Sequence, residues 1–117
     1  MIAKKYRLTG HVKEDFFLTA QVWYLRWGRI YYKQGATADG RVKFGIFVSP
    51  KRIASSVWRH RAKRLLTGTL KELLIDLPWL PGEIVIVVNE RILAQEWEQI
   101  WQDVHYFWER NWQAKKP

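Results

Sequence analysis

The spacing of apolar residues divides the chain into segments with different periods. Over residues 13–25, apolar side chains such as Phe16 and Ala20 recur at three- and four-residue intervals, which is typical of a helix. Apolar residues also occur on the other side of this segment, so we expect both of its faces to be covered. Gly28 ends the helix, and the tyrosine-rich residues 29–33 follow as a strand.

The next segment has a period of two. Every second residue from Val42 to Val48 is a large apolar one, which predicts a strand that ends at Pro50. Residues 34–40 before it have the composition of a turn, and Asp39-Gly40 is a strong hairpin signal. The sequence therefore predicts a hairpin that joins the strands on either side of this turn.

A long amphipathic helix follows, with its N-cap at Ser55 or Ser56 and its end near Ile75. Basic residues lie opposite its apolar stripe or at the borders of that stripe. The stripe consists of Trp58, Ala62, Leu65, Leu66, Thr69, Leu70 and Leu73. A closing helix carries a second apolar stripe, which consists of Leu93, Trp97, Ile100, Trp101, Val104 and Trp108.

Residues 84–88, between these two helices, are apolar without alternation, as in a strand covered on both faces. The order is then helix, two or three strands, helix, strand, helix. This order predicts an α+β two-layer sandwich, in which a small, mostly antiparallel sheet packs against about three helices. A chain of 117 residues is long enough for one domain, which we expect to span residues 1–117.

Composition excludes several classes of protein. The chain has no cysteine, so disulfides, thiolate metal sites and cysteine catalysis are absent. No apolar run approaches the ~18 residues of a membrane span. The first residues do not show a charged segment followed by an apolar one, so we do not expect secretion. We therefore expect a cytoplasmic protein with no membrane partner.

The distribution of charge points to a polyanionic partner. Lys and Arg number 20 against 11 Asp and Glu, which gives a net charge of +9. Nine basic residues and no acidic residue lie between Arg41 and Lys71, so the rest of the chain is neutral. Nucleic acid is the commonest partner of such a segment, although a basic helix face can also serve solubility alone.

The sequence offers no catalytic apparatus. Residues 35–40 have the glycine spacing of a phosphate-binding loop, but Arg41 and Val42 stand where its lysine and hydroxyl residue belong, which favours a turn. The remaining candidates lack the spacing of a nucleophile with its base or of a metal site. They are Ser49, Ser55, Ser56, His11, His60, His105, Glu96 and Glu98. We expect no catalytic residue and no metal ligand in this chain.

The segment around the basic helix has a more specific pattern. The predicted strand ends in Val48-Ser49 and is followed by Lys51-Arg52, the small-residue turn Ala54-Ser55-Ser56 and the helical run Arg59-His60-Arg61-Ala62-Lys63-Arg64-Leu65. This pattern resembles the signature of the protein subunit of bacterial ribonuclease P, in which a strand ending in Val-Ser precedes two basic residues, a small-residue turn and a helix with Arg-x-Arg-x-Lys-Arg-Leu. Softer similarities are Arg7-Leu8, Glu14-Asp15-Phe16 and residues 84–88. His60, Thr67 and Ala20 depart from the family pattern, as in a divergent member.

The resemblance implies a function in which the RNA subunit is the catalyst. That subunit removes the 5′ leader of precursor tRNA with Mg²⁺, and the protein binds both the catalytic RNA and the leader. The resemblance gives the catalytic-RNA contacts as Lys51, Arg52, Arg59, His60, Arg61, Lys63 and Arg64. It gives the leader contacts as Phe16 with Tyr31 or Tyr32, although Phe16 can equally be a core residue. No obligate protein partner is evident, and the protein itself needs no cofactor in this interpretation.

Two other classes of function remain open at this point. One is a stand-alone basic RNA- or DNA-binding module, such as a ribosome-associated protein, that uses the same helix on a different nucleic acid. The other is a protein–protein adaptor whose tryptophan-rich last helix is the interface. Core packing is the favoured interpretation of those tryptophans, because Trp97, Trp101 and Trp108 share one helix stripe.

Overall fold

The computed structural model describes residues 4–8 and 14–112. Within them the element order is helix, three strands, helix, strand, helix, which confirms the predicted α+β sandwich. The principal elements are α1 (Glu14–Thr19), β1 (Gln21–Leu25), β2 (Gly28–Gln34), β3 (Val42–Val48), α2 (Ser56–Asp76), β4 (Gly82–Val88) and α3 (Trp97–Phe107). Shorter turns are η1 (Lys4–Tyr6), η2 (Glu90–Ala94) and the π-helical η3 (Trp108–Trp112).

The helix predicted over residues 13–25 is wrong in its second half. It ends at Thr19, and residues 21–25 instead form β1, which pairs with β2 along its whole length. Aromatic and β-branched residues such as Val22 and Trp23 fit a pleated surface, and a strand also explains apolar residues on both sides. Lys13 lies outside the described residues.

The predicted hairpin between β2 and β3 is also wrong. The strand order is β1-β2-β4-β3, so β4 separates the two strands, antiparallel to β2 and parallel to β3. Asp39-Gly40 still makes a tight turn, with Gly40 at φ +73° and its N–H donating to the Thr37 carbonyl. A turn signal fixes the local backbone, but the most apolar strand takes the central position because both of its sides are then covered.

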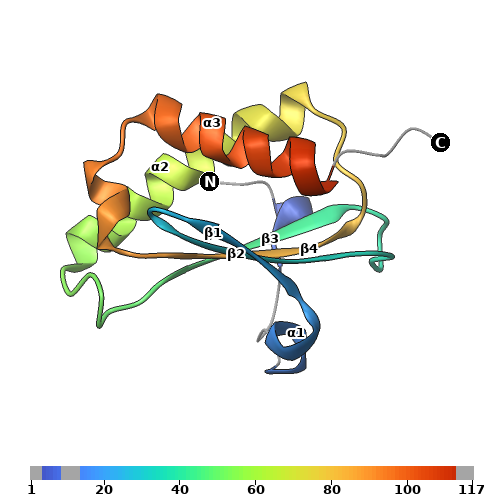
Figure 1. The fold of residues 1–117 in the computed structure, drawn as a ribbon, viewed down its shortest axis with the longest axis horizontal. Helices are drawn as coiled ribbons and strands as arrows, with labels where there is room; N and C mark the ends of the chain where they lie inside the picture. Colours follow the sequence, from blue (N-terminus) through green and yellow to red (C-terminus); the bar gives the residue numbers. More distant parts are fainter. Residues whose placement is uncertain (1–3, 9–13, 113–117) are drawn as a thin grey trace.

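The sheet separates two sets of helices (Figure 1). Helices α2 and α3 cover one face, and the short α1 lies against the other. The core lies between the sheet and the two long helices. It includes Ile30, Val42, Phe44, Ile84, Ile86 and Val88 of the strands and Ala62, Leu66, Leu70, Leu73, Ile100 and Val104 of the helices. No helix in the described part of the chain is long and apolar enough to cross a membrane.

The alternate strand positions point to the other side, which we call the α1 face. They include Tyr24, Arg29, Tyr31, Lys33, Lys43, Phe47, Val85 and Val87. Val85 is fully buried there, so the centre of β4 is covered on both faces, as its sequence predicts. Phe47 and Tyr24 are 48% and 73% exposed, so much of the α1 face is an open aromatic surface.

Candidate nucleic-acid interface

Helix α2 begins where the sequence predicts. Ser55 is its N-cap, and the Ser55 hydroxyl accepts a hydrogen bond from the Trp58 backbone N–H at 3.5 Å. One side of the helix packs into the core through Ala62, Leu66 and the residues that follow at helical spacing. The opposite side is exposed, and we call its polar residues the basic face: His60, Arg61, Lys63 and Arg64.

Two of the predicted RNA contacts have partners within the protein. The Arg52 guanidinium pairs with Glu90, with Nε 2.9 Å from Oε2. The Glu90 carboxyl has a pKa below its usual value, because its own backbone N–H and then Arg52 stabilise the charged form.

The second is Arg59, which is half-buried. Its guanidinium donates to the carbonyl oxygens of Ile53, at 2.9 Å, and Ala54, at 2.7 Å. These bonds tie the first turn of α2 to the segment that enters it. Arg59 therefore positions the start of the helix.

The other cations are available to a partner. Lys51, Arg61, Lys63 and Arg64 are exposed, and none of them pairs with a carboxylate within residues 4–8 and 14–112. Three of them lie within four residues on α2, next to a helix N-terminus whose free N–H groups also favour anions. The arrangement fits the spaced phosphates of a nucleic-acid backbone.

A second candidate surface lies on the α1 face of the sheet. The rings of Phe17 and Tyr31 meet edge to face at 5.0 Å, and Phe16 meets Phe17 at 5.5 Å. Phe16 is 8% exposed, whereas Phe17 and Tyr31 are half-buried. Lys33 also lies here, and its ammonium donates to the Thr19 hydroxyl at 3.1 Å. Aromatic rings with a cation beside them suit unstacked bases of a single strand.

Tyr32 lies on the opposite side of the sheet from Phe16 and Tyr31. Its ring packs against Phe107 at 5.0 Å, and its hydroxyl donates to the Asn111 side-chain oxygen at 3.0 Å. Burial raises the pKa of Tyr32 above its ordinary value. The structure thus brings Tyr31 to α1 and separates Tyr32 from it.

Sequence reasoning missed two aromatic residues on the α1 face. Phe17 follows Phe16 directly, and a helical-wheel argument alone does not show which of the two is open. In the strand 42–48, Phe47 belongs to the alternate positions that do not face the core, together with Lys43 and Gly45. A large aromatic residue among these otherwise non-hydrophobic positions was the signal that could have found it.

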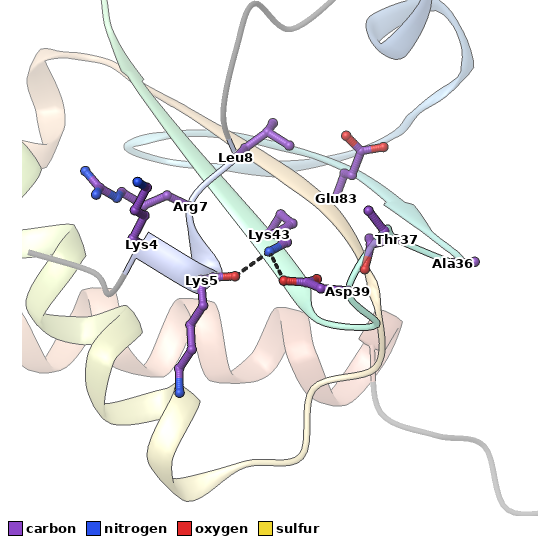
Figure 2. Close-up of a pocket in the computed structure, with 10 residues that line it drawn as sticks. Lys4, Lys5, Arg7, Leu8, Ala36, Thr37, Asp39, Lys43 and Glu83 are labelled. Carbon is purple, nitrogen blue, oxygen red and sulfur yellow. Dashed lines mark hydrogen bonds and ion pairs between the residues drawn. The ribbon is translucent and has the colours of Figure 1, made fainter.

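A cavity of about 780 Å³ opens beside β3 and the β2–β3 turn (Figure 2). The Lys43 ammonium inside it donates to the Lys5 carbonyl and to Asp39 Oδ2, the latter at 2.6 Å. This bond is the main reason that the pKa of Asp39 lies below its usual value. Lys4, Lys5 and Glu83 also line the cavity, so it carries charges of both signs.

The described residues offer no ligand set for a metal ion. In residues 4–8 and 14–112, no three His, Cys, Asp or Glu side chains gather closely enough to hold one. His105, for example, stacks on Trp101 at 4.9 Å and approaches Glu109 at 3.2 Å. His11 lies outside the described residues.

The mixed four-stranded sheet and the basic face define a class, that of small α+β proteins with a surface suited to a polyanion. The family model for ribonuclease P matches residues 3–112, so the chain belongs to the ribonuclease P protein family. Members of this family are the protein component of ribonuclease P, a tRNA-processing ribonucleoprotein and endoribonuclease. Membership implies the ribonuclease P RNA as partner.

Solved structures share the fold. The ribonuclease P protein of Staphylococcus aureus is 17% identical with a TM-score of 0.68, covering 90% of this chain and 94% of that one. A mutant of that protein with defective mRNA degradation activity is 18% identical, with a TM-score of 0.72 and coverages of 92% and 88%. The Thermotoga maritima protein is 12% identical, with a TM-score of 0.67 and coverages of 81% and 86%. No curated protein matches the chain at a significant level.

Proposed function

We propose that this chain is the protein subunit of a ribonuclease P holoenzyme and binds both the catalytic RNA and the 5′ leader of precursor tRNA. Cleavage of the leader is then the work of the RNA subunit with Mg²⁺, and the protein contributes binding and orientation. In this proposal it acts in the cytoplasm. The observation that carries it is the set of exposed cations without carboxylate partners on and before α2.

Binding of the catalytic RNA is assigned to the basic face and to Lys51 and Arg52, which precede α2. Lys51, Arg61, Lys63 and Arg64 contact phosphates directly, and His60 adds a ring or a hydrogen bond beside them. Arg59 keeps the start of the helix in place. The Nε and Nη2 of Arg52 are bound to Glu90, and its remaining guanidinium N–H groups contribute to the contact. Phosphate contacts of this kind release counterions, which makes binding strongly dependent on salt.

Binding of the leader is assigned to the α1 face. Phe17 and Tyr31 offer partly exposed rings on which unpaired bases stack, and Phe16 packs edge to face against Phe17. Stacking tolerates any base, because every base has a π face, so this surface suits leaders of varied sequence. Tyr32 packs against Phe107 on the core side of the sheet, so we do not assign it to the leader-binding surface.

Reconstitution tests the proposal. The chain is mixed with a bacterial ribonuclease P RNA, and cleavage of precursor tRNA is followed at low Mg²⁺, where the RNA alone is slow. We expect the chain to restore cleavage and Lys63→Ala to weaken RNA binding. The matched control is Arg110→Ala, which removes an exposed charge of η3 outside the basic face and should leave binding unchanged. Failure of the wild-type chain to bind this RNA contradicts the proposal.

A further inference from the structure

Trp58 is the most exposed of the eight tryptophans. Its side chain is 49% exposed and lies outside the hydrophobic core, although its spacing predicts a place on the apolar stripe of α2. Four other tryptophans donate their indole N–H to acceptors in the protein: Trp27, Trp79, Trp108 and Trp112. Within residues 4–8 and 14–112 the indole N–H of Trp58 has no acceptor, which is also true of Trp23, Trp97 and Trp101. Trp58 differs from those three in its greater exposure, so core packing does not account for about half of its surface.

Trp58 belongs to the first turn of α2, where its backbone N–H donates to the Ser55 hydroxyl. The Arg61 guanidinium, three residues later on the same side of the helix, lies 5.8 Å from the ring centroid. Trp58 is thus a half-exposed ring with an exposed cation of the basic face over it, and its remaining exposed surface is open to a partner.

We propose that Trp58 is a stacking platform for an unpaired nucleobase of the RNA that binds the basic face. The neighbouring charges are cations without carboxylate partners, which favours a polyanion, and the polyanion of the proposed function is RNA. The base is unpaired because bases inside an A-form helix are already stacked and do not reach a side chain. The inference rests on the proposed function and deepens it: phosphates bind Arg61, Lys63 and Arg64, and an adjacent base from a loop, bulge or end covers Trp58.

Affinity measurements with four proteins test the platform. The probe is a transcript of a bacterial ribonuclease P RNA, and the proteins are the wild type, Trp58→Ala, Trp58→Phe and Ile75→Ala. Trp58→Ala should weaken binding about 5- to 150-fold, the range supplied by one stacked base. Trp58→Phe should retain most of the affinity because it keeps an aromatic face. Ile75 is 84% exposed at the far end of α2, and its truncation should change nothing.

The salt dependence distinguishes stacking from lost charge. Trp58→Ala should leave the slope of log K against log salt unchanged, whereas Arg61→Gln should reduce its magnitude by about 0.7–0.9. Thermal unfolding should be the same for all variants, since Trp58 is not a core residue. Unchanged affinity of Trp58→Ala, with the wild type binding normally, overturns the platform and leaves the proposed function standing. No binding by the wild type overturns the proposed function itself.

Crosslinking identifies the nucleotide. Trp58→p-benzoylphenylalanine places a photoreactive ring at this position, and the crosslink formed in the complex is mapped on the RNA. A crosslink to an unpaired nucleotide supports the proposal. A crosslink only to base-paired nucleotides, or only to a second protein chain, overturns it.

Discussion

Arg59 and Arg61 are two residues apart in one motif, yet their environments differ. Arg61 is exposed and lies beside the Trp58 ring. Arg59 is half-buried and bridges two carbonyl oxygens before α2. A sequence motif presents both as equal RNA contacts, whereas the structure gives Arg59 an additional role in the fold.

This difference is testable by single substitutions. Arg59→Ala removes two charge-assisted hydrogen bonds, partly exposed to water, and should lower the free energy of unfolding by about 1–2 kcal/mol. Arg61→Ala should leave it unchanged within error and weaken binding of the catalytic RNA about tenfold, the value of one such contact. Urea denaturation and filter-binding affinity measure the two effects. Equal stability of the two variants would remove the positioning role of Arg59.

At the scale of the element, helix α2 determines how binding responds to salt. Six cations from Lys51 to Arg64 would give a slope of log K against log salt of about −4 to −5. Because Arg52 is paired with Glu90 and Arg59 with carbonyls, the remaining four predict about −3 to −4. Titration of affinity from low to high salt measures the slope. A slope near zero would contradict binding through phosphates.

Glu90→Gln provides a second check on the same helix. It removes the negative charge that opposes the Arg52 guanidinium, so the slope should become steeper by up to about 0.9 if that cation then contacts a phosphate. An unchanged slope would place Arg52 outside the RNA contact altogether.

The elements also show what the sequence could predict. The limits of α2 follow from a strong cap, Ser55, and a long apolar stripe, and both predictions are confirmed. The end of α1 and the start of β1 could not be predicted in this way. Residues 16–25 are apolar on both sides, so they fit the period of a helix and the period of a strand equally well. The strand order does not follow from the turn at Asp39-Gly40 either, because a turn specifies local geometry and the position of β4 depends on burial across the whole sheet.

The β2–β3 turn supplies a pH-dependent contribution to stability. The Asp39 carboxylate accepts hydrogen bonds from the Lys43 ammonium and the Arg41 backbone N–H, and the pKa of Asp39 is lowered. A lowered pKa means that the contribution is present above the unfolded pKa, about 3.9, and is lost as pH falls through the folded value. Asp39→Asn should therefore be less stable than the wild type at neutral pH, and the difference should vanish in acid. A difference that persists below the carboxyl range would contradict this assignment.

At the scale of the molecule, the tryptophans connect the end of α3 to the sheet. The indole N–H groups of Trp108 and Trp112 donate to the carbonyls of Pro78 and Leu80, on the segment that leads into β4. Gly82 lies beneath Trp112 so closely that a Cβ there would come within 2.6 Å of its ring. This packing supports the core interpretation of the closing helix, and its neighbours Trp97 and Trp101 remain partly exposed. The spacing of the tryptophans does not show which of them are buried. Their burial depends on how residues 77–81 pack against η3.

The two proposed binding surfaces lie on opposite faces of the sheet (Figure 1), which predicts that they act independently. Phe17→Ala should weaken binding of precursor tRNA to the holoenzyme by about 1–3 kcal/mol, the value of one stacked base. It should spare mature tRNA, which has no leader, and assembly with the catalytic RNA. Lys63→Ala should weaken assembly and leave the preference for precursor over mature tRNA unchanged.

The double variant then measures the coupling between the surfaces. Because no side chain is shared between them, the losses in precursor-tRNA binding should add within about 0.3–0.5 kcal/mol once the protein concentration is raised to saturate assembly.

Phe16→Ala is the informative comparison, since Phe16 is 8% exposed and its loss removes buried packing. It should reduce stability as well as leader binding, whereas Phe17→Ala should reduce leader binding alone. Equal losses for precursor and mature tRNA in Phe17→Ala would end the assignment of the leader to the α1 face.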